Sequence, residues 1–104
     1  MSNPQNQPLN AETVLHTLRQ HPELFTEYDI KTLALFGSTA RNQATETSDL
    51  DFLVEFQSDP TLSRYMNLKF WLEDLFSRKV DLVIQDDIKP KIKETVIREA
   101  IHVA

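Results

Sequence analysis

The sequence predicts one layered domain of the α/β or α+β class, in which helices flank a short β-sheet. The chain has 104 residues, which is close to the most common size of a single domain. Apolar runs with the length of strands alternate along it with segments whose apolar residues recur at helical spacing. No internal repeat and no linker interrupts the sequence from residue 10 onward. We therefore expect the order α-β-α-β-α-β-α within one domain that spans residues 10–104.

The N-terminal third is predicted to contain a tail, two helical segments and a strand. Residues 1–9 are polar and contain proline, which is typical of a flexible tail. Asn10 can cap a helix that begins at Ala11, because its side chain can accept a hydrogen bond from a free amide of the first turn. Pro22 can start a second, short helical turn. Residues 32–36 form an apolar run that a glycine ends, so they predict a buried strand.

The middle of the chain alternates between a short helical start, a strand and a long helix. Residues 38–43 could start a helix whose N-terminus faces the loop that follows. Residues 50–56 alternate in part between polar and apolar side chains, as in a strand with two different faces. Residues 63–77 form the longest helical stretch, with apolar side chains near one face.

The C-terminal part predicts a third strand and a last helix. Residues 80–84 (VDLVI) are a short apolar run with one internal aspartate. A proline at position 90 fits the first turn of a helix that runs to about residue 100, because the first helical residue needs no amide donor. The residues of this helix that are predicted to face inward are Ile92, Val96 and Ile97.

The composition excludes several classes of function. The chain has no cysteine, so it can form neither disulfides nor thiolate metal sites, which fits a reducing cytoplasm. Its longest apolar runs are far shorter than the roughly 20 residues that cross a bilayer. The net charge of −5 is opposite in sign to that of a typical free-standing nucleic-acid binder. We therefore expect a cytoplasmic protein with a basic protein partner or a carboxylate metal site, without direct binding to nucleic acid or membrane.

Three aspartates are the first candidate functional residues. Asp49 and Asp51 lie two positions apart, and in a strand such residues face the same side. Two neighbouring carboxylates repel each other unless a cation lies between them, and hard oxygen ligands suit Mg²⁺, which also binds substrate phosphates. Asp81 completes a cluster of carboxylates if its strand is the neighbour in the sheet. Two metal ions on such a cluster could activate an attacking hydroxyl and stabilise the leaving phosphate oxygen.

The only glycine of the chain, Gly37, directly follows the first predicted strand. It permits a tight turn and a close approach of backbone to phosphate, while Ser38 adds a hydroxyl beside the amides that open the next helix. Arg41 could bind a phosphate or pair with an aspartate, and a purely structural ion pair is an equal alternative. Ser48 is a further nucleotide-binding candidate, although shaping the loop is the more common role for such a serine. Phosphate-binding groups next to metal-binding carboxylates indicate a nucleotidyl-transfer site.

These residues also carry a family resemblance. The segment GSTAR, followed by SDLD, resembles the Gly-Ser-x-Ala-Arg and Ser-Asp-x-Asp signature of the minimal nucleotidyltransferases (MNT proteins) of the polymerase-β-like superfamily. VDLV around Asp81 resembles the strand that carries the third carboxylate of the family, and residues 88–103 resemble its closing helix. The resemblance implies the family fold, a small mixed sheet flanked by helices. Asn42 stands where the family usually has glycine, and we expect a small effect because asparagine tolerates left-handed backbone.

The resemblance also implies an activity and a partner. Similar MNT proteins often act as antitoxins that transfer AMP from ATP to a tyrosine of a HEPN-domain ribonuclease toxin. Carried over, Gly37 and Ser38 would hold the nucleotide phosphates, and Asp49 and Asp51 would hold Mg²⁺. Asp81 would bind metal and help to deprotonate the acceptor hydroxyl. Two alternatives are an antitoxin that neutralises its toxin by binding alone, and a small-molecule nucleotidyltransferase, for which a chain of 104 residues leaves little room.

Overall fold

The computed structural model describes residues 9–43, 45 and 48–103 of the chain. In this described part the strands form one mixed sheet with the order β3-β2-β1-β4. Strand β1 runs antiparallel to both β2 and β4, whereas β3 runs parallel to β2. The bounds of the strands are β1 (Ile30–Phe36), β2 (Leu50–Phe56), β3 (Val80–Ile84) and β4 (Ile101–His102).

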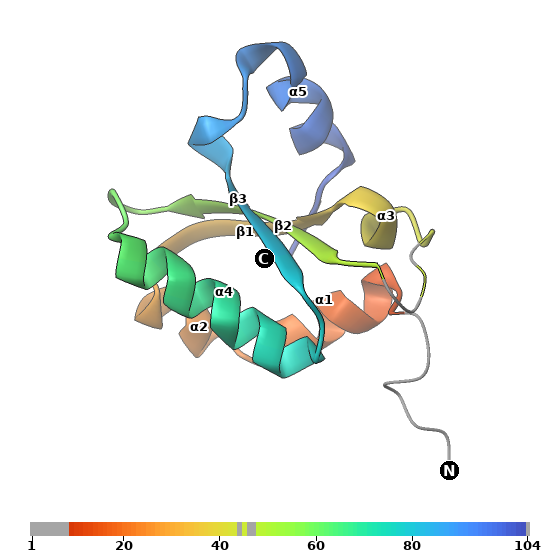
Figure 1. Ribbon diagram of the computed structural model, residues 1–104, viewed down its shortest axis with the longest axis horizontal. Helices are drawn as coiled ribbons and strands as arrows, with labels where there is room; N and C mark the ends of the chain where they lie inside the picture. The colour runs from red at the N-terminus through yellow and green to blue at the C-terminus, as the bar shows by residue number, and fades with distance from the viewer. Residues whose placement is uncertain (1–8, 44, 46–47, 104) are drawn as a thin grey trace.

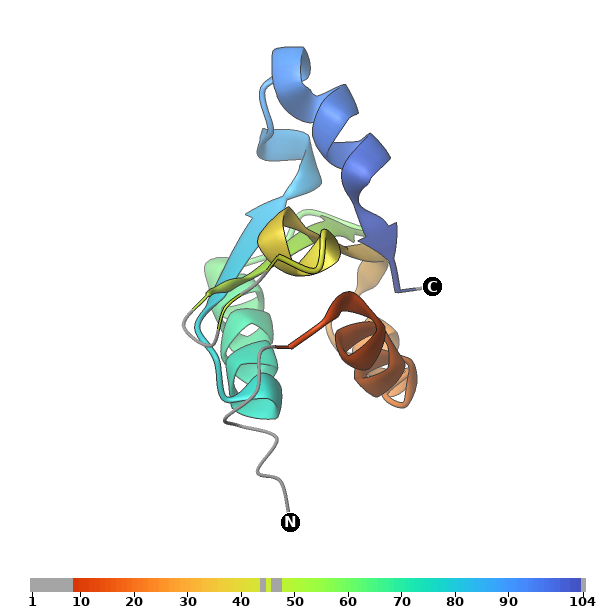
Figure 2. The same ribbon diagram turned by 90° about the vertical axis from the view of Figure 1, so that its right-hand side faces the viewer.

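Helices lie on both sides of this sheet, as Figures 1 and 2 show. One face is covered by α1 (Ala11–Arg19), α2 (Glu23–Glu27) and α4 (Leu62–Phe76). The one-turn helix α3 (Gly37–Ala40) follows β1 directly, and the short 3₁₀ helix η2 (Gln85–Asp87) leads to α5 (Pro90–Glu99), which stands on the opposite side. The predicted class, a short sheet flanked by helices, is confirmed.

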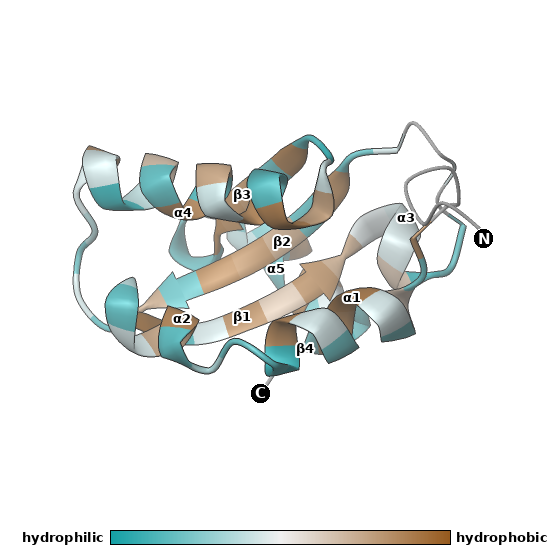
Figure 3. Ribbon diagram, turned by 90° about the horizontal axis from the view of Figure 1, so that it is seen from below, coloured by the Kyte–Doolittle hydropathy of each residue, from teal (hydrophilic) through white to brown (hydrophobic). Residues whose placement is uncertain are grey.

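The core lies between the sheet and the covering helices. Alternate residues of β2, namely Leu50, Phe52 and Val54, are buried against apolar side chains of α1 and α4. Figure 3 shows this side, where the apolar strands β1 and β2 lie between the helices. Because side chains of a strand alternate between faces, the residues between these three project to the opposite side of the sheet. Asp51 is one of them, so hydrophobic burial of its neighbours determines the direction of this aspartate.

Most predicted elements are confirmed; two elements and the orientation of one side chain differ. The helix predicted for residues 38–43 ends after one turn at Ala40, because Asn42 adopts a left-handed conformation with φ 56° that stops a helix. Strand β4 was not predicted, since two residues are too short to show alternation. The inward orientation predicted for Ile92 is wrong: its side chain is 52% exposed, because α5 stands away from the core.

The N-terminal end needs one correction of boundary. Leu9, which the sequence analysis assigned to the tail, packs against the hydrophobic core. The remainder of the predicted tail, residues 1–8, lies outside the described residues. None of the helices in the described part of the chain combines the length and the apolar character that a membrane crossing requires.

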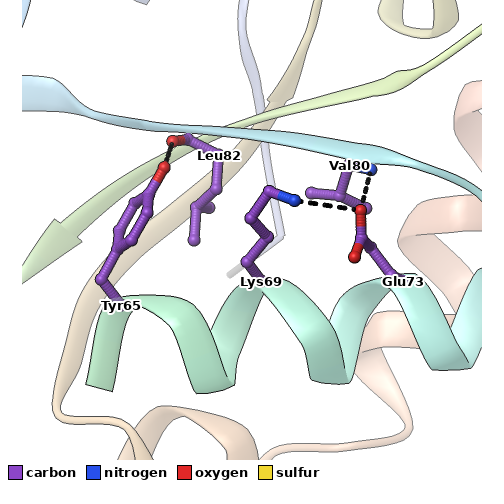
Figure 4. Close-up of polar contacts among 5 residues, drawn as sticks. All are labelled: Tyr65, Lys69, Glu73, Val80 and Leu82. Atoms are coloured by element: carbon purple, nitrogen blue, oxygen red, sulfur yellow. Dashed lines mark hydrogen bonds and ion pairs between the residues drawn. The ribbon is translucent and has the colours of Figure 1, made fainter. Parts of the chain in front are cut away.

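Helix α4 is hydrogen-bonded to strand β3 on either side of Asp81 (Figure 4). The Tyr65 hydroxyl donates to the Leu82 carbonyl. The Glu73 carboxylate accepts the Val80 amide at 3.0 Å. Strand β3 is an edge strand, whose outer backbone groups have no neighbouring strand to bind. Side chains of α4 therefore replace a missing strand partner at the two residues that flank Asp81.

We predict that Glu73→Gln lowers the free energy of unfolding by about 1 kcal/mol at pH 7, because a charged acceptor is lost from a partly exposed site. The Val80 amide, followed by Lys69 at 3.1 Å, lowers the pKa of Glu73 from its ordinary 4.5. The native state therefore binds fewer protons than the unfolded state, and this stabilisation is present above pH 4.5 and is lost as the pH falls through the lowered pKa. Urea unfolding across this range measures the effect.

The matched control is Glu94→Gln, which removes a carboxylate of α5 that is 87% exposed and lies 3.6 Å from the Arg98 guanidinium. Its cost should stay below about 0.5 kcal/mol at every pH. The free energies of unfolding of Glu73→Gln and of the parent protein should converge as the pH falls below the pKa of Glu73. A difference that stays the same at low pH would contradict the assigned contact.

Candidate functional site

The candidate site lies where the C-terminal end of β1 meets the N-terminal ends of β2 and β3. In the sheet, Phe36 is paired with Asp51, and Asp51 is paired with Asp81. Paired residues on neighbouring strands carry their side chains on the same face. The two aspartates therefore lie side by side, and the condition set in the sequence analysis, that their strands are neighbours, is met. Gly37 comes directly after Phe36, which brings the predicted phosphate-binding turn to the same place.

Gly37 and Asp51 share one small space. A Cβ atom placed on Gly37 would lie 2.1 Å from Asp51 Oδ2, a distance that no side chain can adopt. The backbone of Gly37 is also left-handed, with φ 76°, which disfavours residues that have a Cβ. Two separate constraints thus require glycine at this position. The carboxylate of Asp51 consequently lies against the backbone of the turn.

Asp51 has a raised pKa, which both burial and the neighbouring charges of the site influence. Its side chain is half-buried, and burial is the main reason why the pKa of its carboxyl is raised above the usual 3.8. The negative charges of Asp81 and Asp49 raise this pKa further, whereas the charge of Arg41 partly offsets them. Carboxylates held together in this way favour a bound cation, which would remove their mutual repulsion.

The carboxylates do not form a closed cluster. Asp81 is exposed, because the edge position of β3 leaves its side chain in solvent, although its neighbours Val80 and Leu82 are buried. Asp49 is exposed as well and precedes the first residue of β2. Within the residues that the structure describes, no group of three or more His, Cys, Asp or Glu side chains is placed to hold a metal ion. The arrangement is a pair in register, Asp51 and Asp81, with Asp49 adjacent along the chain.

Helix α3 places the candidate phosphate-binding residues. It begins at Gly37, and its N-cap is the backbone of Phe36 without a side-chain hydrogen bond, so Ser38 is not a capping residue. Ser38 is half-buried, while Thr39 is buried and faces the interior. The buried Thr39 side chain therefore anchors one side of the turn in the protein, and Gly37, at its start, lies close to the Asp51 carboxylate. Binding of phosphates by Gly37 and Ser38 stays a prediction.

Arg41 and Ser48 have structural partners. Arg41 is exposed; its Nε donates to Gln43 at 3.3 Å, and its guanidinium lies 3.9 Å from the Glu99 carboxylate of α5. The ion pair is thus with a glutamate and not with one of the aspartates. Ser48 Oγ accepts the Thr45 amide at 2.8 Å, which is the loop-shaping role considered in the sequence analysis. Contacts of either residue with a nucleotide stay predictions.

The contacts that support the site were not foreseen from the sequence. Tyr65 and Glu73 were interpreted only as part of a helix, although they hold the strand of Asp81. Asn42 was interpreted as a neutral replacement of glycine, although its side chain accepts the backbone amide of Ala11. Neither contact has a sequence signal, because each joins segments that are distant along the chain.

Comparison with other proteins gives consistent matches. The family described as "Nucleotidyltransferase domain" matches residues 18–103 of the chain. A relative from Methanocaldococcus jannaschii, provisionally named a protein adenylyltransferase, is 46% identical over 88 residues, which cover 83% of this chain and 90% of that protein. Protein adenylyltransferase MntA of Thermococcus cleftensis is 36% identical over 96 residues, which cover 91% of this chain and 97% of that protein.

Solved structures share the fold. One, provisionally described as a minimal nucleotidyltransferase, has 41% identity and a TM-score of 0.71, covering 84% of this chain and 93% of its own. Another is the complex of a tri-AMPylated HEPN toxin from Shewanella oneidensis with its MNT antitoxin; it has 16% identity and a TM-score of 0.63, covering 88% and 71%. At that lower identity the similarity concerns the fold alone. The fold implied by the sequence resemblance is thereby confirmed.

We predict that Gly37→Ala costs about 1–2 kcal/mol of unfolding free energy from its left-handed backbone alone. A further cost arises because the Asp51 carboxylate must move away from the new methyl group. In an Asp51→Ala background this further cost disappears, so a double-mutant cycle should give a coupling of at least about 0.5 kcal/mol. Urea unfolding of the four proteins measures the cycle. Strictly additive costs would contradict the close approach of the two residues.

We predict that Asp51→Asn raises the free energy of unfolding at pH 7 when a chelator removes metal ions. The native pKa of Asp51 is raised, so the native state binds more protons than the unfolded state, and stability falls as the pH rises from 3.8 through the native pKa. Asparagine carries no charge, so the variant avoids the cost of a buried negative charge. Its gain in the free energy of unfolding is therefore present at pH 7 and vanishes below pH 3.8. Asp59→Asn, in an exposed turn, is the control and should change nothing. A loss of stability in Asp51→Asn would contradict the assigned electrostatics.

Proposed function

The chain belongs to the nucleotidyltransferase domain family, and on this basis we propose that it is an antitoxin that acts as a protein adenylyltransferase. It transfers AMP from ATP to a tyrosine hydroxyl of a cognate HEPN-type ribonuclease toxin and thereby inactivates the toxin. The observation that carries this proposal is the register of Asp51 with Asp81 beside the glycine turn. The names of its relatives support the reaction, and the toxin complex with the same fold supports the partner.

The chain's own residues have separate parts in the proposed reaction. Gly37 and Ser38 receive the phosphates of ATP through the amides that open α3. Arg41, the C-cap of α3, and Ser48, which precedes β2, are further contacts of the nucleotide in this proposal. The tyrosine oxygen of the toxin attacks the α-phosphorus, the bond from that phosphorus to the β-phosphate oxygen breaks, and pyrophosphate leaves. Asp81, exposed on the edge strand, accepts the proton of the tyrosine hydroxyl.

The carboxylates fit Mg²⁺ as the metal of this reaction. They supply hard oxygen ligands, and the pKa of Asp51 is raised by burial first and then by the negative charges of Asp81 and Asp49, which the charge of Arg41 only partly offsets. Asp51 and Asp81, which are in register, would hold the metal, and Asp49 would join them by family resemblance, in a set of up to two ions. When bound, Mg²⁺ would neutralise phosphate charge during the transfer. ATP and Mg²⁺ are abundant in the cytoplasm, which we propose as the place of the reaction.

We predict that the purified chain transfers label from [α-³²P]ATP, and not from [γ-³²P]ATP, to a candidate HEPN toxin from the same genome. Transfer should require Mg²⁺ and should fall by at least about a hundredfold in Asp51→Asn, because such sites depend on metal charge and positioning. Asp49→Asn and Asp81→Asn should also abolish it. Gel autoradiography and mass spectrometry of the toxin measure the label and identify its residue.

The matched control is Asp59→Asn, which removes one exposed carboxylate at the opposite end of β2 and should retain full activity. Label from the γ-phosphate would mean phosphoryl transfer and would contradict the proposed reaction. Absence of any label, combined with protection of cells from the toxin by Asp51→Asn, would favour the alternative in which the antitoxin acts by binding alone.

A further inference from the structure

Asn42 connects the candidate phosphate-binding turn to helix α1. Its side-chain Oδ1 accepts the backbone amide of Ala11 at 3.0 Å, and the two residues are 31 positions apart. Ala11 is the first residue of α1, so its amide has no acceptor within the helix. The backbone of Asn42 is left-handed, with φ 56°, which asparagine tolerates better than most residues. One residue therefore provides both the bend of the turn and a hydrogen bond to the core.

The two partners of this hydrogen bond differ in how firmly they are held. On one side, α1 is part of the core: Ala11, Val14, Leu15 and Leu18 are all buried. On the other side, residues 41–43 are exposed. Their backbone amides donate to carbonyls of the preceding turn, at 3.3, 3.0 and 2.8 Å. The bond of Asn42 thus ties a short exposed turn to a rigid element of the fold.

We propose that Asn42 is a positioning residue, whose side chain fixes the turn of residues 37–43 against α1 so that Gly37 and Ser38 are held ready for the nucleotide. Glycine at this position would permit the same backbone bend but would leave the Ala11 amide without this acceptor. The part of the proposal that concerns the nucleotide rests on the proposed function, whereas the part that concerns the turn does not.

The same helix end offers a matched control. Asn10 is the N-cap of α1, and its Oδ1 accepts the Thr13 amide at 2.8 Å. Asn10 and Asn42 thus bind two different amides of one helix terminus, but only Asn42 belongs to the turn. Asn10→Ala should lower the stability of α1 without altering the turn. An effect that follows from a weakened helix alone would therefore appear equally in Asn10→Ala.

The hydrogen bond can also be removed from the helix side. Ala11→Pro eliminates the donor, and proline is well tolerated at the first position of a helix. The preceding residue, Asn10, is already extended, with φ −104° and ψ 166°, as a residue before proline must be. Ala11→Pro leaves the sequence of the turn unchanged, so it separates loss of the bond from the added backbone freedom of Asn42→Gly.

The first measurement is native-state hydrogen exchange of the Arg41 and Gln43 amides, without nucleotide. Their protection should fall in Asn42→Gly and in Ala11→Pro, should fall no further in the double variant, and should be unchanged in Asn10→Ala. Unchanged protection in Ala11→Pro, or an equal loss in Asn10→Ala, would overturn the proposal. Because no ATP is present, this result is independent of the proposed function.

The second measurement is the steady-state kinetics of AMP transfer. Asn42→Gly and Ala11→Pro should raise KM for ATP roughly three- to tenfold with little change in kcat, because the turn must then be ordered during binding. Asn10→Ala should leave KM unchanged even if its unfolding midpoint is lower. Equal KM values in all variants would overturn the role in nucleotide binding. If the parent protein transfers no AMP, the proposed function fails, and the exchange experiment still decides whether Asn42 fixes the turn.

Discussion

The close approach of Asp51 to the backbone of Gly37 is the constraint on which the candidate site depends. The 2.1 Å between Asp51 Oδ2 and a hypothetical Cβ leaves room for hydrogen only. The turn after β1 can therefore lie against the strand that carries the carboxylates, and phosphate-binding amides and metal-binding oxygens come within one small region. The register of the sheet extends this arrangement to Asp81. A single sequence position thus determines whether the two halves of the site can meet.

Ionisation of two carboxylates in this domain changes the stability of the fold in opposite directions. Glu73 accepts the Val80 amide and is paired with Lys69, so its pKa is lowered and its ionised form stabilises the fold. Asp51 is half-buried beside other negative charges, so its pKa is raised and its ionised form destabilises the fold. The fold does not offset the negative charge of Asp51, and Asp51 belongs to the family signature. Groups that act on a ligand are often held in such a destabilising environment. The contrast separates a structural acid of helix α4, Glu73, from a candidate functional acid of strand β2, Asp51.

The sequence predicted the elements with strong local signals and missed those that depend on distant contacts. Strands β2 and β3 were predicted with their observed bounds, because each has a clear apolar run of strand length. The aspartates and Gly37 could be found because their residue types and spacing match the needs of a single reaction, nucleotidyl transfer. The orientation of Ile92 was wrong, since an amphipathic pattern does not tell whether a helix lies on the core or stands away from it. The sequence does not decide whether Asp81 is buried or exposed, because the residues of one strand do not determine the position of that strand in the sheet.

The contacts that hold the site come from elements outside the signature, which explains why they escape motif-based reasoning. Helix α4 binds the outer edge of β3 on both sides of Asp81, and helix α1 binds the turn after α3 through Asn42. Both helices are anchored by buried apolar residues on the covered face of the sheet. The hydrophobic core therefore supports the opposite, polar face through a few hydrogen bonds, and the precision of the site follows from the rigidity of the core. In a chain this small, the same helices that stabilise the fold also position its candidate catalytic groups.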